Sequence, residues 1–516
     1  MNLPVVGKWS RFERSFKSSR AYGNALQEAS LTVRFTSPAG EVTEVPGFWD
    51  GGKIWRVRFS PDQPGRWTFS TACSDRPNRG LDNQTGEFIC TAATGTNRFR
   101  AHGPIRVALD HLHFEHADGT PFFWLADTVW NGPCLSESKD WDLYARVRAG
   151  QGFSVALWSA VPGREAHKQR AFSGSPERIA VDPDFFKRLD ARLERLSQAG
   201  ILSAVSPFLD GPPLPEEQAI LLARYIVARW QAEPAAWLIA FDPLTSSEAA
   251  DDWKKIGQSL FGRSKHAPVI LYAGQTSSLI ANFRDQAWVD AFGFQVTTDV
   301  AEDALRKTFA RPLTEEWMKA PVRPMIAFTP HENGFWPKAA KRFTSDEVRH
   351  AAYWGLLLAP PAGVTYGGQG VANWDTASES PADKTRAAGL PFWQKALFMP
   401  AAKEMSLLAR FLQPTEWWRL RPQSKIVSLQ PGDTSPNRQI LAAQTDGEAR
   451  DLTFVYVPED RTIELTTATF PVSPTITWFN PRTGQYHPAV AVVGERVCQF
   501  PTPDPGDWVL VMKGAK

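Results

Sequence analysis

The chain has 516 residues, more than one hydrophobic core of ordinary size organises, so we expect two or three domains. Its 57 Lys and Arg nearly balance 55 Asp and Glu, and no basic run forms a stripe that could follow a phosphate backbone, which argues against nucleic acid as a partner. No apolar stretch reaches the roughly 18 to 20 residues that cross a bilayer, so no membrane insertion is expected. The start, MNLPVVGKWSRFERSF, lacks a signal-peptide core, which indicates a cytoplasmic protein or one whose leader has been removed.

Residues 1–95 predict an N-terminal antiparallel β-sandwich. LTVRFTSPAG, TEVPGFWDGG and KIWRVRFSPDQPGRWTFSTA alternate apolar and polar residues, with turn-forming residues about every 8 to 12 positions. Cys73 and Cys90 lie in neighbouring strand-like runs, which leaves open a cross-strand disulfide or two buried free thiols. The four cysteines match no metal-binding spacing, so we expect neither a metal nor another cofactor.

Residues 96–422 predict a (β/α)8 TIM barrel, because short apolar runs alternate with amphipathic helical segments. A doubly wound sheet is the competing fold, but no glycine-rich phosphate loop follows the first strand. Residues 423–516 return to strand-like patterns such as DLTFVYVP and DWVLVMKG, which predict a second β-sandwich. The eight expected barrel strands are FFWLADT (122–128), FSVALWS (153–159), ILSAVSPF (201–208), AAWLIAFD (235–242), PVILYAG (268–274), AFGFQV (291–296), PMIAFTP (324–330) and GVTYGGQG (363–370).

The candidate functional residues follow these strands, since barrel active sites lie at the C-terminal ends of the strands. Several carboxylates beside many of the 21 Trp residues suit glycoside hydrolysis, in which one carboxyl protonates the leaving oxygen and another attacks or activates water. Asp242 is the candidate general acid and Glu332 the candidate base or nucleophile. The candidate sugar-binding residues are Asp127, Trp130, Trp158, Gln295, His331, Trp336, Tyr366 and Trp374.

Each candidate also has a structural interpretation. Asp127 and Asp242 could cap the helices that follow them, and Glu332 could be a solvated loop residue. His331 could be a loop hydrogen-bonder, and Tyr366 could fill the barrel mouth. Trp is a large core and interface residue as well as a stacking partner for sugars, so its abundance alone does not establish sugar binding.

Long motifs resemble the bacterial apiosidase-like glycoside hydrolases, which have a DUF5060 N-terminal domain, a DUF4038 barrel and a collagen-binding-like C-terminal sandwich. They are GFWDGGKIWRVRFSPDQPGRWTF (47–69), TPFFWLADTVW (120–130), RYIVARWQAEPAAWLIAFD (224–242), VRHAAYWGLLLAPPAGVTYGGQGVANWD (348–375) and TWFNPRTGQYHP (477–488). The resemblance implies the three-domain fold, a complex glycan (oligosaccharide or polysaccharide) as substrate, and a secreted or periplasmic location.

The resemblance also bears on the catalytic pair. Relatives usually end strand 4 with Gly-Gly-Asp, whose Asp is catalytic, and this chain has Ala240-Phe241-Asp242. Relatives have a catalytic Glu immediately before the strand-7 Pro, where this chain has Thr329 before Pro330. Two functions follow as alternatives: a glycoside hydrolase in which Glu332 has replaced the second carboxylate, or a catalytically inactive carbohydrate-binding or scaffolding relative.

Overall fold

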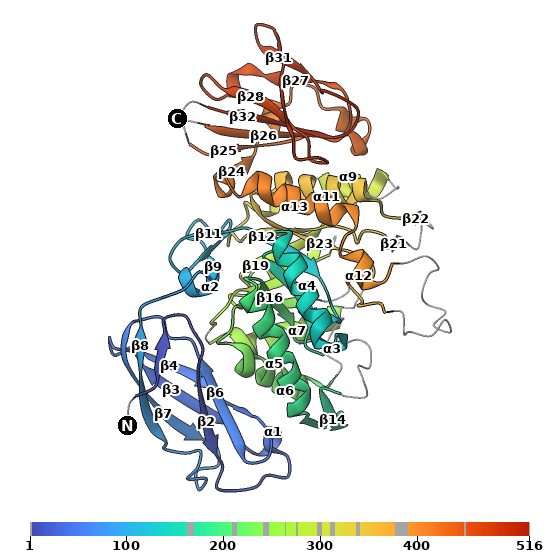
Figure 1. Ribbon diagram of the computed structural model, residues 1–516. Helices are drawn as coiled ribbons and strands as arrows, with labels where there is room; N and C mark the ends of the chain where they lie inside the picture. Colours follow the sequence, from blue (N-terminus) through green and yellow to red (C-terminus); the bar gives the residue numbers. More distant parts are fainter. Residues whose placement is uncertain are drawn as a thin grey trace.

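The computed structural model describes residues 3–161, 170–208, 214–240, 247–263, 265–274, 277–296, 302–309, 315–336, 341–376, 391–447 and 450–514. A central barrel lies between an N-terminal and a C-terminal β-sandwich (Figure 1). This arrangement confirms the predicted fold class. Within the described part, no helix has the length and apolar character needed to span a bilayer.

The N-terminal sandwich packs a five-stranded sheet of order β1-β8-β7-β3-β4 against a three-stranded sheet of order β2-β6-β5. Aromatic rings fill the space between the sheets, as where Phe12 stacks on Phe88 with ring centres 4.0 Å apart. One pairing differs from the expected antiparallel pattern, because β1 and β8 run parallel. The strands are β1 (Val5–Gly7), β2 (Phe12–Lys17), β3 (Leu31–Thr36), β4 (Val42–Pro46), β5 (Phe48–Trp49), β6 (Ile54–Phe59), β7 (Gly65–Cys73) and β8 (Thr85–Thr91), with the short helix α1 (Ala25–Glu28) between β2 and β3.

The cysteines in this sandwich are free thiols, and the disulfide alternative is wrong. Cys73 ends β7, opposite Leu31 of β3. Cys90 of β8 lies opposite Gly65, at the other end of β7. The two thiols are therefore separated by the length of a nine-residue strand, far beyond the reach of an S–S bond.

All eight predicted barrel strands are present, and they pair in parallel around a closed ring. Their sequences are apolar almost throughout because the strands are covered on both faces. Helix α2 (Arg98–Ala101) and a small sheet of β9 (Ile105–Val107), β10 (Phe114–His116) and β11 (Pro121–Phe122) precede the ring. The barrel strands are β12 (Trp124–Thr128), β13 (Val155–Ser159), β16 (Leu202–Ser206), β17 (Ala235–Ala240), β18 (Val269–Tyr272), β19 (Ala291–Gln295), β20 (Met325–Phe328) and β23 (Pro361–Gly367).

Helices surround the ring, and local signals in the sequence set their ends. The Asp182 carboxylate accepts hydrogen bonds from the backbone N–H groups of Asp184 and Phe185 and so caps α5. Apolar residues on one face of α5 are buried against the barrel. The described helices are α3 (Gly132–Leu135), α4 (Ser138–Gly150), α5 (Pro183–Gln198), α6 (Glu216–Trp230), α7 (Ser247–Phe261), α8 (Ser277–Phe283), α9 (Glu302–Phe309), α11 (Ser345–Leu358), α12 (Trp393–Ala396) and α13 (Pro400–Leu412). Two small hairpins, β14 (Phe172–Ser175) with β15 (Arg178–Val181) and β21 (Phe335–Trp336) with β22 (Lys341–Arg342), lie in the connections.

The two faces of each barrel strand belong to different cores. Trp124 and Ala126 of β12 pack in the cluster that fills the barrel interior. Leu125, between them, packs with the surrounding helices. Because side chains alternate along a strand, this alternation determines which residues at the strand ends can reach the mouth of the barrel.

The C-terminal sandwich pairs a sheet of order β24-β25-β26-β32-β28-β29 with one of order β27-β31-β30. Its large sheet packs on α11 and α13, where the Phe411 ring stacks on Phe479 with centres 4.2 Å apart. The strands are β24 (Leu420–Pro422), β25 (Leu441–Thr445), β26 (Leu452–Val457), β27 (Thr462–Thr466), β28 (Thr475–Phe479), β29 (Tyr486–Pro488), β30 (Val492–Val493), β31 (Val497–Pro501) and β32 (Trp508–Lys513), with single 3-10 turns η1–η5 between residues 417 and 469.

Buried ion pairs join both sandwiches to the barrel. Arg229 of α6 pairs with Asp50 of the N-terminal sandwich at 2.9 Å and with Asp190 of α5 at 2.7 Å. Arg58 of β6 reaches the same Asp190 at 2.8 Å. On the other side of the barrel, Arg349 of α11 pairs with Asp507 of the C-terminal sandwich at 2.8 Å.

Candidate functional site

Three consecutive strands contribute contacting side chains to the mouth of the barrel. The Tyr272 hydroxyl, at the end of β18, donates a hydrogen bond to Gln295 Oε1, at the end of β19, over 3.0 Å. The Tyr272 ring lies 4.4 Å from that of Phe328, the last residue of β20. Ile270, two residues before Tyr272, is in the barrel interior, so Tyr272 faces the same side at a higher level. The three side chains thus form one wall of the mouth.

His331 extends this wall beyond the end of β20. A Cβ atom on Gly367 of β23 would lie only 2.0 Å from His331 Cδ2, so the imidazole rests directly on the glycine backbone. Burial lowers the pKa of His331 to about 4, so the ring is neutral near pH 7 and offers one hydrogen-bond donor and one acceptor. A neutral imidazole of this kind suits sugar hydroxyls, which also donate and accept.

Trp130 lies on the strand 1 side of the same mouth. It follows β12, is partly exposed, and packs against the cluster inside the barrel. Its carbonyl accepts a hydrogen bond from the N–H of Ser159, at the end of β13, over 3.0 Å. Of the predicted sugar-binding residues, Trp130, Gln295 and His331 are therefore placed at the mouth.

Four other predicted sugar-binding residues face the helices instead. Asp127 is fully buried outside the ring, where it accepts hydrogen bonds from Arg148 Nε at 2.7 Å and from the Tyr144 hydroxyl at 3.0 Å. Trp158 packs on Trp230 of α6. The Tyr366 ring packs near Phe153, and Trp374 stacks on Trp393 with ring centres 4.3 Å apart. All four side chains hold the helices to the barrel, and we leave them out of the proposed site.

Glu332 also lies on the helix side, and its exposed fraction is only 3 %. Its carboxylate accepts a 2.8 Å hydrogen bond from the Tyr366 hydroxyl and two 3.2 Å bonds from the Ala401 N–H, in the first turn of α13. Burial raises the pKa of Glu332. Its backbone forms a parallel bridge with Gly368, so the chain beyond β20 runs alongside the extension of β23. These contacts indicate that Glu332 anchors α13.

The remaining candidates, Asp242 and Trp336, lie outside the described residues or side chains. Asp242 comes two residues after the end of β17 and is among the residues the structure leaves undescribed. The backbone of Trp336 is described, whereas its side chain is not.

Thr329 stands immediately before Pro330, at the position where the sequence resemblance implies a second catalytic carboxylate. Its hydroxyl donates to the carbonyl of Thr365 in the neighbouring β23 over 3.3 Å, and its N–H donates to the same carbonyl over 2.9 Å. Thr329 thus takes part in strand pairing. Among the described side chains, no group of three His, Cys, Asp or Glu residues is arranged to hold a metal ion.

Tyr272 and Phe328 were not among the residues that the sequence indicated. Both lie inside the strand runs PVILYAG and PMIAFTP, each two residues after an isoleucine. Counting alternate positions from Ile270 and Ile326 toward the strand ends would have identified both, because side chains of equal parity share a face.

The fold of this chain is similar to that of solved structures described as glycoside hydrolases. One described as a glycoside hydrolase is 17% identical, with a TM-score of 0.69 over 82% of this chain and 99% of that chain. A glycoside hydrolase family 5 structure from Bacteroides vulgatus ATCC 8482 is also 17% identical, with a TM-score of 0.68 over 82% and 95%. A candidate glycoside hydrolase from the same organism reaches 0.74 over 99% and 100%, again at 17% identity. At 17% identity the likeness is one of fold: this chain folds as these glycoside hydrolase structures do.

The chain belongs to the apiosidase-like family. The model described as "Apiosidase-like, catalytic domain" matches residues 109–419, more than half of the chain. The DUF5060 domain of unknown function matches residues 5–74, and the model named "Putative collagen-binding domain of a collagenase" matches residues 422–513. These matches confirm the resemblance inferred from the sequence motifs. No curated protein matches the chain.

Proposed function

We propose that this protein hydrolyses a glycosidic bond of a complex glycan at the C-terminal mouth of its barrel. The observation that carries the proposal is the wall formed by Tyr272, Gln295, Phe328 and His331, at the end of the barrel where enzymes of this architecture carry their sites. Its aromatic faces and neutral hydrogen-bonding groups suit the C–H faces and hydroxyls of a sugar. Membership of the apiosidase-like family supports the reaction class.

Asp242 is the proposed general acid. In the sequence it comes two residues after Ala240, the end of β17, and β17 pairs with β18, which carries Tyr272. A general acid must remain protonated near neutral pH, and burial beside an apolar neighbour raises the pKa of a carboxyl group. Phe241, the preceding residue, is the expected apolar neighbour.

A second candidate function, glycan binding without hydrolysis, is favoured by the contacts of Glu332 and Thr329. The ordinary two-carboxylate mechanism requires a second carboxylate that faces the sugar. Glu332 instead has its oxygens bonded to Tyr366 and Ala401, and Thr329 is bonded to Thr365. Two described candidate carboxylates, Asp127 of β12 and Glu332 after β20, face the helices.

The experiment that separates the two functions is incubation of the full chain with defined oligosaccharides, with products followed by mass spectrometry and binding by calorimetry. Product formation that depends on Asp242 supports hydrolysis. Saturable binding without product, in the same samples after long incubation, supports the binding function. Neither binding nor product from any oligosaccharide would contradict both.

Replacing Glu332 tests its anchoring role. In Glu332→Gln the amide oxygen can still accept hydrogen bonds from Tyr366 and Ala401, so we expect kcat to stay within about fivefold of the native value, whereas loss of a catalytic carboxylate would cost roughly 100-fold or more. Glu332→Ala removes both bonds and should lower the thermal midpoint, since a buried hydroxyl and a helix N–H lose their acceptor. A Glu332→Gln variant that folds normally but has lost turnover would show instead that the carboxylate is catalytic.

Replacing Gln295 tests the mouth. Gln295→Leu keeps the size of the side chain but removes the groups that bind Tyr272 and, in the proposal, a sugar hydroxyl. We expect the dissociation constant for the bound oligosaccharide to rise by about 5- to 100-fold, corresponding to roughly 1–3 kcal/mol for an unpaired buried polar group. Gln258→Leu on α7, away from the mouth, is the matched control. Equal affinity of the Gln295 variant and native protein would place sugar binding elsewhere.

A further inference from the structure

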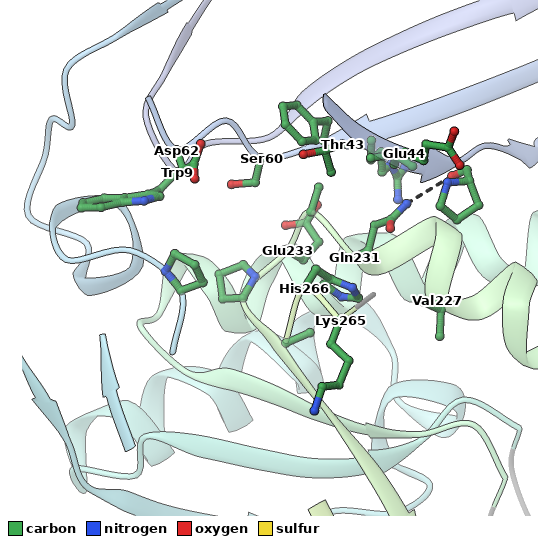
Figure 2. A pocket seen from close by; sticks show the side chains of 18 of the residues that line it. Trp9, Thr43, Glu44, Ser60, Asp62, Val227, Gln231, Glu233, Lys265 and His266 are labelled. Carbon is green, nitrogen blue, oxygen red and sulfur yellow. Dashed lines mark hydrogen bonds between the residues drawn. The ribbon is translucent and has the colours of Figure 1, made fainter. Parts of the chain in front are cut away.

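A cavity of about 370 Å3 lies between the N-terminal sandwich and the end of the barrel where β17 and β18 begin. This is the opposite end of these strands from the mouth. Thr43, Ser60 and Asp62 come from the sandwich, and Gln231 and His266 face them from the barrel (Figure 2). The volume is within the roughly 300–1,000 Å3 of small-molecule sites.

The lining combines apolar surfaces with polar groups. Phe59 and Trp67 of the sandwich and Phe99, Pro234 and Phe261 of the barrel side contribute rings. Such rings offer flat apolar surface to a ligand that has C–H faces. Hydrogen-bonding groups also stand among these rings, and a mere packing defect between two domains would not account for them.

Several of those polar groups have spare hydrogen-bonding capacity. Gln231 Nε2 donates to the carbonyl of Pro46 over 3.1 Å, the dashed line in Figure 2, which leaves Gln231 Oε1 as an acceptor. The Trp237 indole donates to His266 Nε2 over 3.2 Å, so a neutral His266 carries its proton on Nδ1 and is a donor. Within the described residues, no hydrogen bond engages the Ser60 hydroxyl or the Asp62 carboxylate.

Trp9 closes one end of the cavity in a strained conformation. Its φ angle is 62°, a left-handed backbone that a bulky residue rarely adopts. The Trp9 N–H donates to the carbonyl of Pro61 over 2.8 Å, and the ring packs so closely on Gly103 that a Cβ there would lie 2.8 Å from it. Backbone strain of this kind concentrates at binding sites.

The walls of the cavity are fixed before any ligand binds. Arg58, which lines it, pairs with Asp190 at 2.8 Å and donates to the carbonyl of Arg229 over 2.9 Å. Arg229 in turn holds Asp50 of the sandwich. A preformed cavity spares a ligand the entropy cost of ordering its site.

The charges of the lining exclude a strongly ionic ligand. Glu44 pairs with Arg34, Glu233 with Arg11, and Lys265 with Asp290. Asp62 is left as a single exposed carboxylate, which repels anions and accepts hydrogen bonds from hydroxyls. The charge of Arg58 is balanced by Glu13 and Asp190, and the remaining polar groups of the lining are neutral donors and acceptors.

We propose that this cavity is a second carbohydrate-binding site, which holds a neutral sugar segment of a polysaccharide away from the barrel mouth. The proposal rests on the proposed action on glycans. Beyond that proposed function, the second site means that one molecule of the protein contacts its glycan at both ends of the barrel. Short oligosaccharides cannot span both sites, so the cavity acts only on the binding of long chains.

The test is affinity electrophoresis of the full chain in native gels that contain neutral polysaccharides (xyloglucan, arabinan, galactomannan) or acidic ones (polygalacturonan, alginate). The double variant Asp62→Ala with Gln231→Ala removes two hydrogen-bonding groups, and Ser60→Tyr fills the cavity. Asp460→Ala, an exposed substitution on the C-terminal sandwich, is the control. We expect at least one neutral polysaccharide to retard the native protein, with an apparent dissociation constant about 10-fold higher for both cavity variants and unchanged for the control.

The proposal is overturned if no neutral polysaccharide retards the native protein, if acidic polysaccharides alone do so, or if both cavity variants bind like the control. Hydrolysis of short oligosaccharides is measured in the same preparations. Cavity variants should keep it, whereas Gln295→Leu should lose mouth binding and still be retarded by long chains. Absence of hydrolysis in the native protein with cavity-dependent retardation would contradict the proposed function and leave the second site standing.

Discussion

The Asp242→Asn variant is expected to lose about 100- to 10,000-fold in kcat while it binds oligosaccharide with a dissociation constant within about twofold of the native value. Asparagine has nearly the same shape as aspartic acid, so it preserves contacts with the sugar. It has no proton to give to the leaving oxygen, so the bond-breaking step loses its acid. Binding and turnover should therefore separate in this variant.

Substrates with different leaving groups sharpen this test. A nitrophenyl glycoside needs little protonation as it leaves, so its hydrolysis should fall much less than that of an oligosaccharide. Asp251→Asn, an exposed position on the helix that follows Asp242, is the matched control. Full turnover of an oligosaccharide by Asp242→Asn would exclude Asp242 as the general acid.

The Arg148→Met variant is expected to show the second large effect, a loss in the free energy of unfolding. Arg148 and Asp127 are both fully buried, and each neutralises the other between α4 and β12. Removal of the guanidinium alone leaves a buried carboxylate without its cation, which destabilises by roughly 3–5 kcal/mol. The free energy of unfolding from urea titration, followed by tryptophan fluorescence, measures this loss.

The double variant Asp127→Leu with Arg148→Met provides the internal control. It removes both charges, so we expect it to be more stable than Arg148→Met alone, although it lacks more native groups. A loss below about 1 kcal/mol in Arg148→Met would show that the pair is not needed to hold α4 to the barrel.

The fold could be predicted because barrel strands leave a strong local signal. Each of the eight apolar runs is bounded by turn residues and followed by a helical pattern. Seven of the eight barrel strands lie within the predicted runs, and β23 begins at Pro361, two residues before its predicted run. The apolar character of these strands also prevents the sequence from showing which residues line the site. A strand that is apolar on both faces does not show which face is inside. The positions of Trp158 and Tyr366 near strand ends therefore predict site residues, although Trp158 packs on Trp230 of α6 and Tyr366 faces Arg148 of α4.

Features made from distant segments had no local signal at all. Glu332 bonds to Ala401, 69 positions away, and no periodicity in the sequence connects those two residues. The cavity behind the barrel draws its lining from β4, β6, α6 and the segment before β18, which meet only after folding. The roles proposed for Asp242 and the mouth residues remain predictions for the experiments above.

The ion pairs between the barrel and its sandwiches have a consequence for how the molecule comes apart. Arg229 and Arg349 each have counter-ions on two sides of a domain boundary, and both guanidinium groups are almost fully buried. Separation of either sandwich would leave a charged group facing an apolar surface, so a half-detached molecule lies high in free energy. Heating should therefore melt all three parts in one calorimetric transition, and fragments expressed without their neighbours should be far less stable than the same segments in the whole chain.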